Sequence, residues 1–314
     1  MTLLNQVHPN LLMAGVGIVC LLVIATIIIL ILKKLSPDKD YTELVLRIKS
    51  WWMMSGVFLF VLLIGKTVSI VFFSVLSFLA LKEYFSLIPT RRADRRTLFW
   101  AYLSIPFQYY WVSIGWYGMF IIFIPVYVFL FLPFRLVISK ETRGFLKSTS
   151  AIHWGVMTMV YCLSHHVYLL ALPNENNPNG GSAALLLFLV FLTEGNDILQ
   201  YIWGKLFGKK KIAPSISPNK TIVGFVGASV TIIFVSYLLA PLLTPLSMMH
   251  SLIIGLLVSC VGFIGDIVIS ALKRDLQVKD SGSLIPGHGG ILDRVDSLIY
   301  TAPIFFHFIR YFYY

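Results

Sequence analysis

Charged residues are scarce in this 314-residue sequence: Asp, Glu, Lys and Arg make up 12% of it, against about 25% in a typical soluble domain. Hydrophobic residues make up 58%, and the mean hydropathy is +0.83. This balance excludes an ordinary soluble domain and predicts an integral membrane protein.

Membrane β-strands and paired cysteines are also lacking. No segments of about ten residues alternate as they do in a membrane barrel, so helices must satisfy the backbone hydrogen bonds within lipid. The three cysteines, Cys20, Cys162 and Cys260, lie in apolar runs without a CxxC pair, which predicts packing roles. The apolar stretch 11–32 is too long for a signal-peptide core and follows no basic residue, so we expect a retained helix.

Apolar segments of membrane-spanning length recur along the chain. Since a helix needs roughly 20 apolar residues to cross a bilayer, they predict an all-α, polytopic integral membrane protein with about ten transmembrane helices. The boundary between the second and third segments, at Gly65-Lys66, is the least defined. The segments lie near residues 11–32, 51–65, 67–82, 98–113, 116–138, 150–171, 182–202, 221–240, 247–271 and 297–312.

Positive charge follows the alternation of the loops. All but two of the 25 Lys and Arg residues lie in every second loop, at 33–50, 82–97, 135–149, 203–220 and 272–296. Because cytoplasmic loops are enriched in Lys and Arg, we expect these loops in the cytoplasm and both termini on the non-cytoplasmic side. The formal net charge of +11 then reflects topology, and we expect no nucleic acid partner. A cluster such as Lys209–Lys211 is equally well explained as an anchor to anionic lipid.

Acidic residues lie within predicted membrane helices, where an ionisable side chain is costly and therefore indicates function. Glu194 and Asp197 are three positions apart, on one face of their helix. Asp266 ends a long apolar run, and Ser270 and Lys273 lie near it on the helix surface. The alternative is a structural pair in which Lys273 neutralises Asp266.

The loop at 272–296 combines charge with glycine. Carboxylates suit Mg²⁺ or Mn²⁺, because hard cations prefer oxygen ligands, and Lys and Arg neutralise phosphate oxygens. Glycine allows the backbone to approach an anion closely. A lone loop histidine such as His288 is more often a hydrogen-bonding strut than an acid or base. The residues concerned are Lys273, Arg274, Lys279, Asp280, Gly282, Gly287, His288, Gly289, Gly290, Asp293, Arg294 and Asp296.

A second loop precedes the helix predicted to begin near residue 221. Ser217 or Thr221 can cap that helix, whose free N–H groups and positive dipole end attract anions. Lys220 lies at the same point of the chain. The segment fits an anion site and an ordinary capped helix equally well.

Two motifs extend across these loops. The first is Ser270-x-Leu272-Lys273-Arg274-x4-Lys279-Asp280-x-Gly282-x2-Ile285-Pro286-x-His288-Gly289-Gly290-x2-Asp293-Arg294-x-Asp296. The second is Asn196-Asp197-x3-Tyr201-x2-Gly204-Lys205-x2-Gly208 followed by Ser217-Pro218-x-Lys220-Thr221-x2-Gly224. Together they resemble the conserved regions of the phosphatidate cytidylyltransferases, or CDP-diacylglycerol synthases. The resemblance is strong over residues 194–300, whereas the first 180 residues match only as membrane helices.

The resemblance implies that CTP and phosphatidate give CDP-diacylglycerol and pyrophosphate in phospholipid biosynthesis, with Mg²⁺ alone or with a second cation. It implies metal ligands at Asp197, Asp266, Asp293 and Asp296. It implies catalytic roles for Asp266, Asp293, Lys273 and Lys220. It implies substrate binding by Ser217, Pro218, Lys220, Arg274, Lys279, His288, Gly289, Gly290 and Arg294.

The resemblance also implies a homodimer whose active site faces the cytoplasm, in the inner membrane if the cell is prokaryotic. We accordingly expect residues 1–181 to form a scaffold that encloses lipid, and residues 182–314 to form the catalytic domain. The lipid phosphate is already anionic and needs no general base, so positioning and charge neutralisation suffice for catalysis.

The sequence departs from the family pattern at two acids. Val223 and Ile269 stand where the family usually has Glu, and Gln200 stands where Ala is common. The missing acids leave the number of metal ions and the lipid phosphate open, and suggest a divergent branch. The alternatives are a CTP-dependent kinase for a polyprenol-type lipid, a membrane transporter, and a relic without activity.

Overall fold

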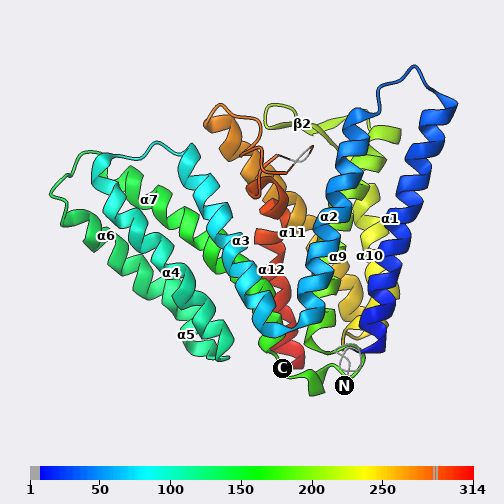
Figure 1. Cartoon of the computed structure of the whole chain (residues 1–314). Helices are drawn as coiled ribbons and strands as arrows, with labels where there is room; N and C mark the ends of the chain where they lie inside the picture. The colour runs from blue at the N-terminus through cyan, green and yellow to red at the C-terminus, as the bar shows by residue number, and fades with distance from the viewer. Residues whose placement is uncertain (1–7, 286, 288) are drawn as a thin grey trace.

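A computed structural model describes residues 8–285, 287 and 289–314, most of which are helical (Figure 1). Seven of the described helices are long and apolar enough to cross a membrane. This confirms the all-α fold class, while the count of ten transmembrane helices remains a prediction. The seven are α1 (Pro9–Leu35), α2 (Thr42–Ile64), α3 (Lys66–Leu87), the continuous stretch Tyr117–Val137, α9 (Gly181–Phe207), α10 (Ile222–Leu243) and α11 (Met248–Asp275).

The other elements connect these spans. The stretch Tyr117–Val137 consists of α5 (Tyr117–Ile122), a π-helical turn and α6 (Phe129–Val137). The remaining helices are α4 (Arg95–Ser113), α7 (Phe145–Val156), α8 (Leu163–Tyr168) and α12 (Leu292–Tyr313). Two short antiparallel strands, β1 (Lys211–Ala213) and β2 (Ser217–Thr221), lie between α9 and α10.

Local sequence explains where two of the helices begin. Gly65 has φ of 130°, a conformation that favours glycine, and it separates α2 from α3 where the sequence left the boundary open. Thr221 is the N-cap of α10, because its Oγ1 accepts a hydrogen bond from the Gly224 N–H at 3.0 Å. Thr221 is therefore the cap, rather than Ser217.

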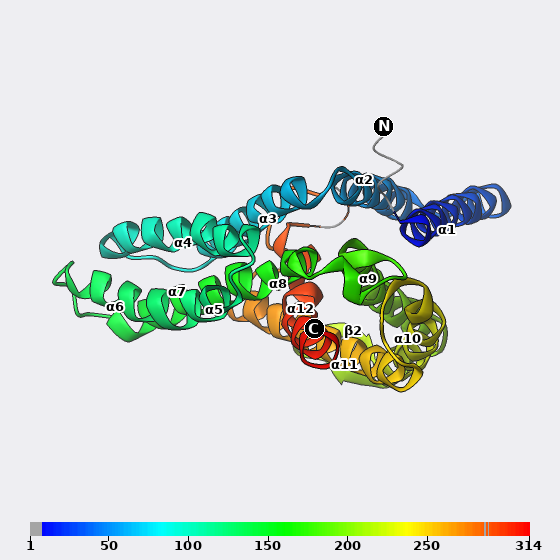
Figure 2. The same cartoon turned by 90° about the horizontal axis from the view of Figure 1, so that it is seen from below.

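Apart from α1 and α2, which pack against each other and continue into α3, the helices form two groups joined by α3 and α8. Helices α9, α10, α11 and α12 pack against one another, and α4, α5, α6 and α7 form a separate group (Figure 2). The start of α1 and the end of α12 lie at one end of the molecule, opposite β2 (Figure 1). Which end faces the cytoplasm remains a prediction. Cys162 and Cys260 are partly buried as expected, but Cys20 is exposed because α1 contributes little to the core.

Glycines allow close contact between the helices of the C-terminal group. A side chain at Gly265 of α11 would place its Cβ 2.6 Å from the backbone oxygen of Asp296 on α12. At Gly224 of α10 the corresponding distance, to the backbone oxygen of Gln200 on α9, is 2.8 Å. Small residues permit this approach between membrane helices. Gly265 therefore allows its neighbour Asp266 to lie beside Asp296.

Candidate active site

Acidic side chains from three helices converge on one lysine. Lys220 Nζ, at the end of β2, forms an ion pair with Asp266 of α11 and lies 3.7 Å from Oδ1 of Asp197 on α9. Asp296 of α12 interacts electrostatically with both aspartates and with Lys220. Lys220 Nζ also donates a hydrogen bond to Gln200 Oε1 at 2.8 Å. We call Lys220, Asp197, Asp266 and Asp296 the carboxylate cluster.

The carboxylate cluster has an excess of negative charge. Burial of Lys220 opposes its charged form, but Asp197 and Asp266 outweigh burial and hold the pKa of the ammonium above its usual value. Oδ2 of Asp197 accepts a hydrogen bond from Ser297 Oγ at 2.7 Å, whereas its buried Oδ1 has no hydrogen bond from any described residue. A single ammonium thus faces three carboxylates, one of which has a free oxygen.

The donor atoms of this cluster suit a hard divalent cation. Carboxylate oxygens are the ligands that Mg²⁺ prefers, and Oδ1 of Asp197 is buried without a hydrogen bond from any described residue. Lys220 Nζ lies among these carboxylates. Among the described residues, no group of three or more His, Cys, Asp or Glu side chains is arranged to hold a metal ion. The chemistry therefore fits a metal ion, provided that Lys220 Nζ gives up its contact with Asp266.

Asp293, the other predicted metal ligand, makes different contacts. Its Oδ1 pairs with Lys273 Nζ at 2.7 Å, and its Oδ2 accepts hydrogen bonds from the N–H groups of Ser281 and Gly290 at 2.8 and 2.9 Å. The alternative in which Lys273 neutralises Asp266 is therefore wrong, because Lys273 is directed to α12. The prediction that Asp293 binds metal stays a prediction, but both of its oxygens have donors.

Glu83 is a partner of this loop that the sequence analysis did not identify. Although Glu83 belongs to α3, its carboxylate accepts hydrogen bonds from Ser281 Oγ at 3.0 Å and from the N–H groups of Ile291 and Leu292, both at 2.9 Å. It thereby caps the start of α12. An isolated acid at the end of an apolar segment was the available signal. We call Asp293, Lys273, Glu83 and their backbone partners the loop anchor.

Two glycines of the first motif, Gly289 and Gly290, leave room for the side chains of this loop anchor. Gly289 has φ of 81°, which favours glycine, and its missing side chain leaves room for the Asp293 carboxylate. The missing side chain of Gly290 leaves room for Glu83 and Ser281 in the same way. Their predicted contact with substrate stays a prediction, and His288 lies outside the described residues.

The other predicted substrate-binding residues surround the hairpin. Ser217 and Pro218 lie on β2, close in sequence to Lys220. Arg274 donates hydrogen bonds to the backbone oxygens of Ile216 and Val278, each at 3.2 Å, and so joins the end of α11 to the hairpin. Lys279 is exposed, without a hydrogen bond or ion pair to any described residue.

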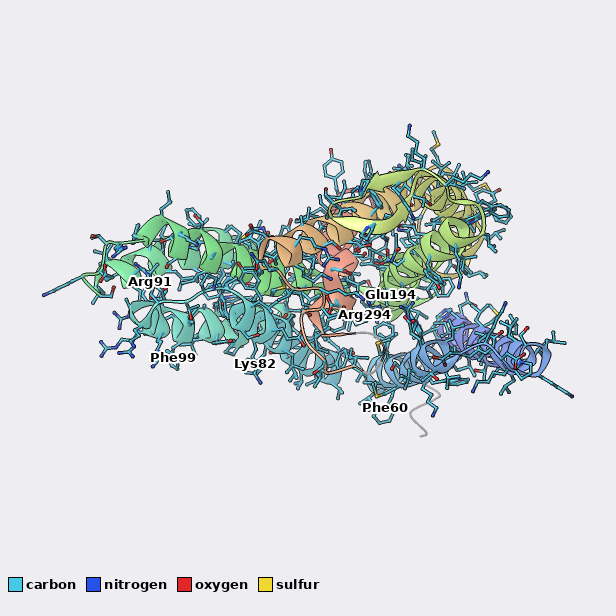
Figure 3. The ribbon with its side chains drawn as sticks, turned by 90° about the horizontal axis from the view of Figure 1, so that it is seen from above. Phe60, Lys82, Arg91, Phe99, Glu194 and Arg294 are labelled. Atoms are coloured by element: carbon cyan, nitrogen blue, oxygen red, sulfur yellow. The ribbon has the colours of Figure 1, made fainter. Side chains whose placement is uncertain are left out.

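Arg294 connects the carboxylate cluster to an apolar cavity. It interacts electrostatically with Asp197 and Asp296, and its Nε is buried without a hydrogen bond from the described part of the chain. Together with Glu194 it lines a cavity of about 360 Å³ whose other walls are largely apolar. Figure 3 shows the two labelled side chains next to one another in the middle of the molecule.

The profile of the cytidylyltransferase family matches residues 45–312, most of the chain. The chain belongs to the cytidylyltransferase family. It is 34% identical over 275 residues to a phosphatidate cytidylyltransferase of Staphylococcus saprophyticus, covering 79% of this chain and 92% of the relative. A phosphatidate cytidylyltransferase of Staphylococcus aureus strain COL is 32% identical over 266 residues, with coverage of 79% and 92%. The family match over residues 45–312 includes both the carboxylate cluster and the loop anchor.

A divergent branch of this family is also supported. The chain is 46% identical over 291 residues to the Escherichia coli K12 protein named uncharacterized protein YnbB, covering 93% of this chain and 95% of that one. Membership makes the protein a nucleotidyltransferase and so favours an enzyme over a transporter. At the two departures from the family pattern, Ile269 is fully buried and Val223 lies in the first turn of α10.

Proposed function

We propose that the protein transfers the cytidylyl group of CTP to phosphatidate or a related lipid phosphate, for phospholipid biosynthesis. The observation that carries this proposal is the carboxylate cluster, in which Asp197, Asp266 and Asp296 converge with Lys220 at the hairpin end of the membrane helices. A group of acids around one lysine suits a triphosphate brought with a metal ion.

The reaction needs few groups beyond those that hold its substrates. An oxygen of the lipid phosphate attacks the α-phosphorus of CTP, the bond from that phosphorus to the bridging oxygen breaks, and pyrophosphate leaves. Since the attacking oxygen already carries negative charge, no residue has to remove a proton. This agrees with a site that contains acids and cations, with Lys220 as the cation nearest to the acids.

We assign Mg²⁺ to the oxygens of Asp197, Asp266 and Asp296. When bound, Mg²⁺ neutralises triphosphate oxygens as charge moves to the leaving group. Lys220 is the residue assigned to a phosphate. Lys273 and Asp293 hold the backbone N–H groups of Ser281 and Gly290 at the start of α12. We further propose a homodimer, which the family resemblance implies, in the inner membrane if the cell is prokaryotic. The charge alternation of the loops supports an active site that faces the cytoplasm.

The test is an assay of the purified full chain with labelled CTP, Mg²⁺ and a panel of lipid phosphates. We expect a nucleotide-linked lipid and free pyrophosphate. Asp266→Asn should lower turnover at least 100-fold, which corresponds to about 2.7 kcal/mol of transition-state stabilisation. The matched control is Asp275→Asn, which changes an exposed residue at the end of the same helix and should alter turnover less than twofold.

Two outcomes would contradict the proposal. Release of CDP together with a newly phosphorylated lipid would indicate a CTP-dependent lipid kinase, because a kinase transfers the γ-phosphoryl group. Unchanged turnover in Asp266→Asn would show that the carboxylate cluster is not the site.

A further inference from the structure

The apolar cavity next to the carboxylate cluster has an unusual polar end. It lies between α2, α3, α9 and α12, and its apolar walls include Val57 and Phe58 of α2 and Val75 of α3. Glu194 and Arg294 are its ionisable lining residues (Figure 3). Two larger cavities, of about 660 Å³ each, lie at the opposite end of the helices, away from the cluster.

Arg294 at this end has an unsatisfied donor. Its Nε is buried without a hydrogen bond from the described residues, although Asp197 and Asp296 are close enough to interact with its charge. A buried guanidinium donor without a partner is energetically unfavourable. A phosphate group satisfies such a donor, because guanidinium binds phosphate oxygens with matched geometry.

Glu194 imposes a second condition on the ligand. Its carboxyl group lines the cavity together with Arg294 (Figure 3) and has no hydrogen bond or ion pair with any described residue. A carboxyl oxygen in an apolar cavity is stabilised when a ligand donates a hydrogen bond to it. With the phosphate at Arg294, that donor must be a group beside the phosphate.

We propose that this cavity binds the acyl chain of a lipid phosphate with a free hydroxyl next to the phosphate, the hydroxyl donating to Glu194 and the phosphate facing Arg294. This inference rests on the proposed function and specifies its lipid. The cavity volume, about 360 Å³, is at the small end of the roughly 300–1,000 Å³ usual for ligand pockets, which favours one chain over two. Lysophosphatidate is the simplest lipid of this class.

The cavity itself is tested by a matched pair of substitutions on α3. Val75, 51% exposed, lines the cavity, whereas Val71, 58% exposed and one turn away, does not. Val75→Trp should fill the cavity and raise the KM for lysophosphatidate at least fivefold, with the KM for CTP unchanged. Val75→Trp should also weaken binding of fluorescently labelled lysophosphatidate in the absence of CTP. Val71→Trp should change neither value more than twofold, and equal effects of the two substitutions would overturn the proposal.

The hydroxyl contact is tested by substrate preference. We expect wild-type protein to have a kcat/KM for lysophosphatidate at least tenfold higher than for diacyl phosphatidate. Glu194→Leu, which removes the acceptor, should abolish this preference, and Glu194→Gln, which keeps an acceptor oxygen, should retain part of it.

The outcomes separate this inference from the proposed function. Preference of the wild type for diacyl phosphatidate, or an unchanged preference in Glu194→Leu, would overturn the inference and leave cytidylyl transfer intact. Failure of the wild type to transfer a cytidylyl group to either lipid, while it still binds labelled lysophosphatidate, would contradict the proposed function alone.

Discussion

The carboxylate cluster and the loop anchor are both built from acids and one lysine, but they differ in how completely their oxygens are satisfied. In the loop anchor, Asp293 and Glu83 together accept hydrogen bonds from backbone N–H groups, a serine hydroxyl and Lys273. In the cluster, one ammonium faces three carboxylates, and Oδ1 of Asp197 has no donor among the described residues. Satisfied carboxylates stabilise a fold, whereas unsatisfied ones remain available to a ligand.

Asp197→Asn separates these two roles most sharply. The substitution removes a charge that Asp266 and Asp296 repel, while the amide oxygen can still accept the hydrogen bond from Ser297. We expect turnover to fall at least 100-fold, about 2.7 kcal/mol, with the thermal midpoint in detergent unchanged or higher. The Mg²⁺ concentration for half-maximal activity should rise. A clear loss of stability would show that Asp197 is a structural residue.

Asp293→Asn should have the opposite effects on stability and on the Mg²⁺ requirement. Removing one partner of a buried ion pair costs about 3–5 kcal/mol, because Lys273 is left without its counter-ion. The thermal midpoint should therefore fall, and turnover should fall tens of fold as the loop loses its position. The Mg²⁺ concentration for half-maximal activity should stay the same. A rise in that concentration would instead confirm Asp293 as the metal ligand that the sequence predicts.

The sequence predicted which acidic residues lie close together better than it predicted the partner of each one. Composition and the two motifs indicated the all-α membrane fold and the acids of the cluster, because both depend on local patterns. The partner of Lys273 depends on how α11 is rotated against α12, so the sequence left a pair with Asp266 open as an alternative, whereas Lys273 pairs with Asp293.

The contribution of Glu83 shows a second limit of prediction from the sequence. Glu83 and its partners Ser281, Ile291 and Leu292 are about 200 positions apart in the chain, and no periodicity links them. Their contact follows from the packing of α3 beside the loop, which only the fold reveals. The first 181 residues are therefore more than a scaffold, since the side chain of Glu83 holds Ser281 and the start of α12.

Glu83→Ala should have an intermediate effect on turnover and should also lower stability. It leaves three donors without an acceptor, at about 1–3 kcal/mol each where they remain buried, and should lower the thermal midpoint by about 5 °C or more. Turnover should fall about tenfold because the start of α12 loses its cap. The control is Glu43→Ala, which breaks an exposed pair with Arg47 and should change stability very little. Equal effects in the two variants would exclude a role for Glu83 in the loop.

Lys279→Ala should have the smallest effect and tests the exposed edge of the same loop. Lys279 has no described partner to lose, so the thermal midpoint should not change. If its ammonium meets a phosphate of CTP, the KM for CTP should rise by a few-fold at low salt and by less at high salt, because exposed charges are screened. Lys210→Ala is the control, since it removes an equally exposed lysine near the hairpin. A KM that responds equally to both would assign Lys279 to the general positive charge of this surface, leaving Lys220 as the lysine specific to the triphosphate.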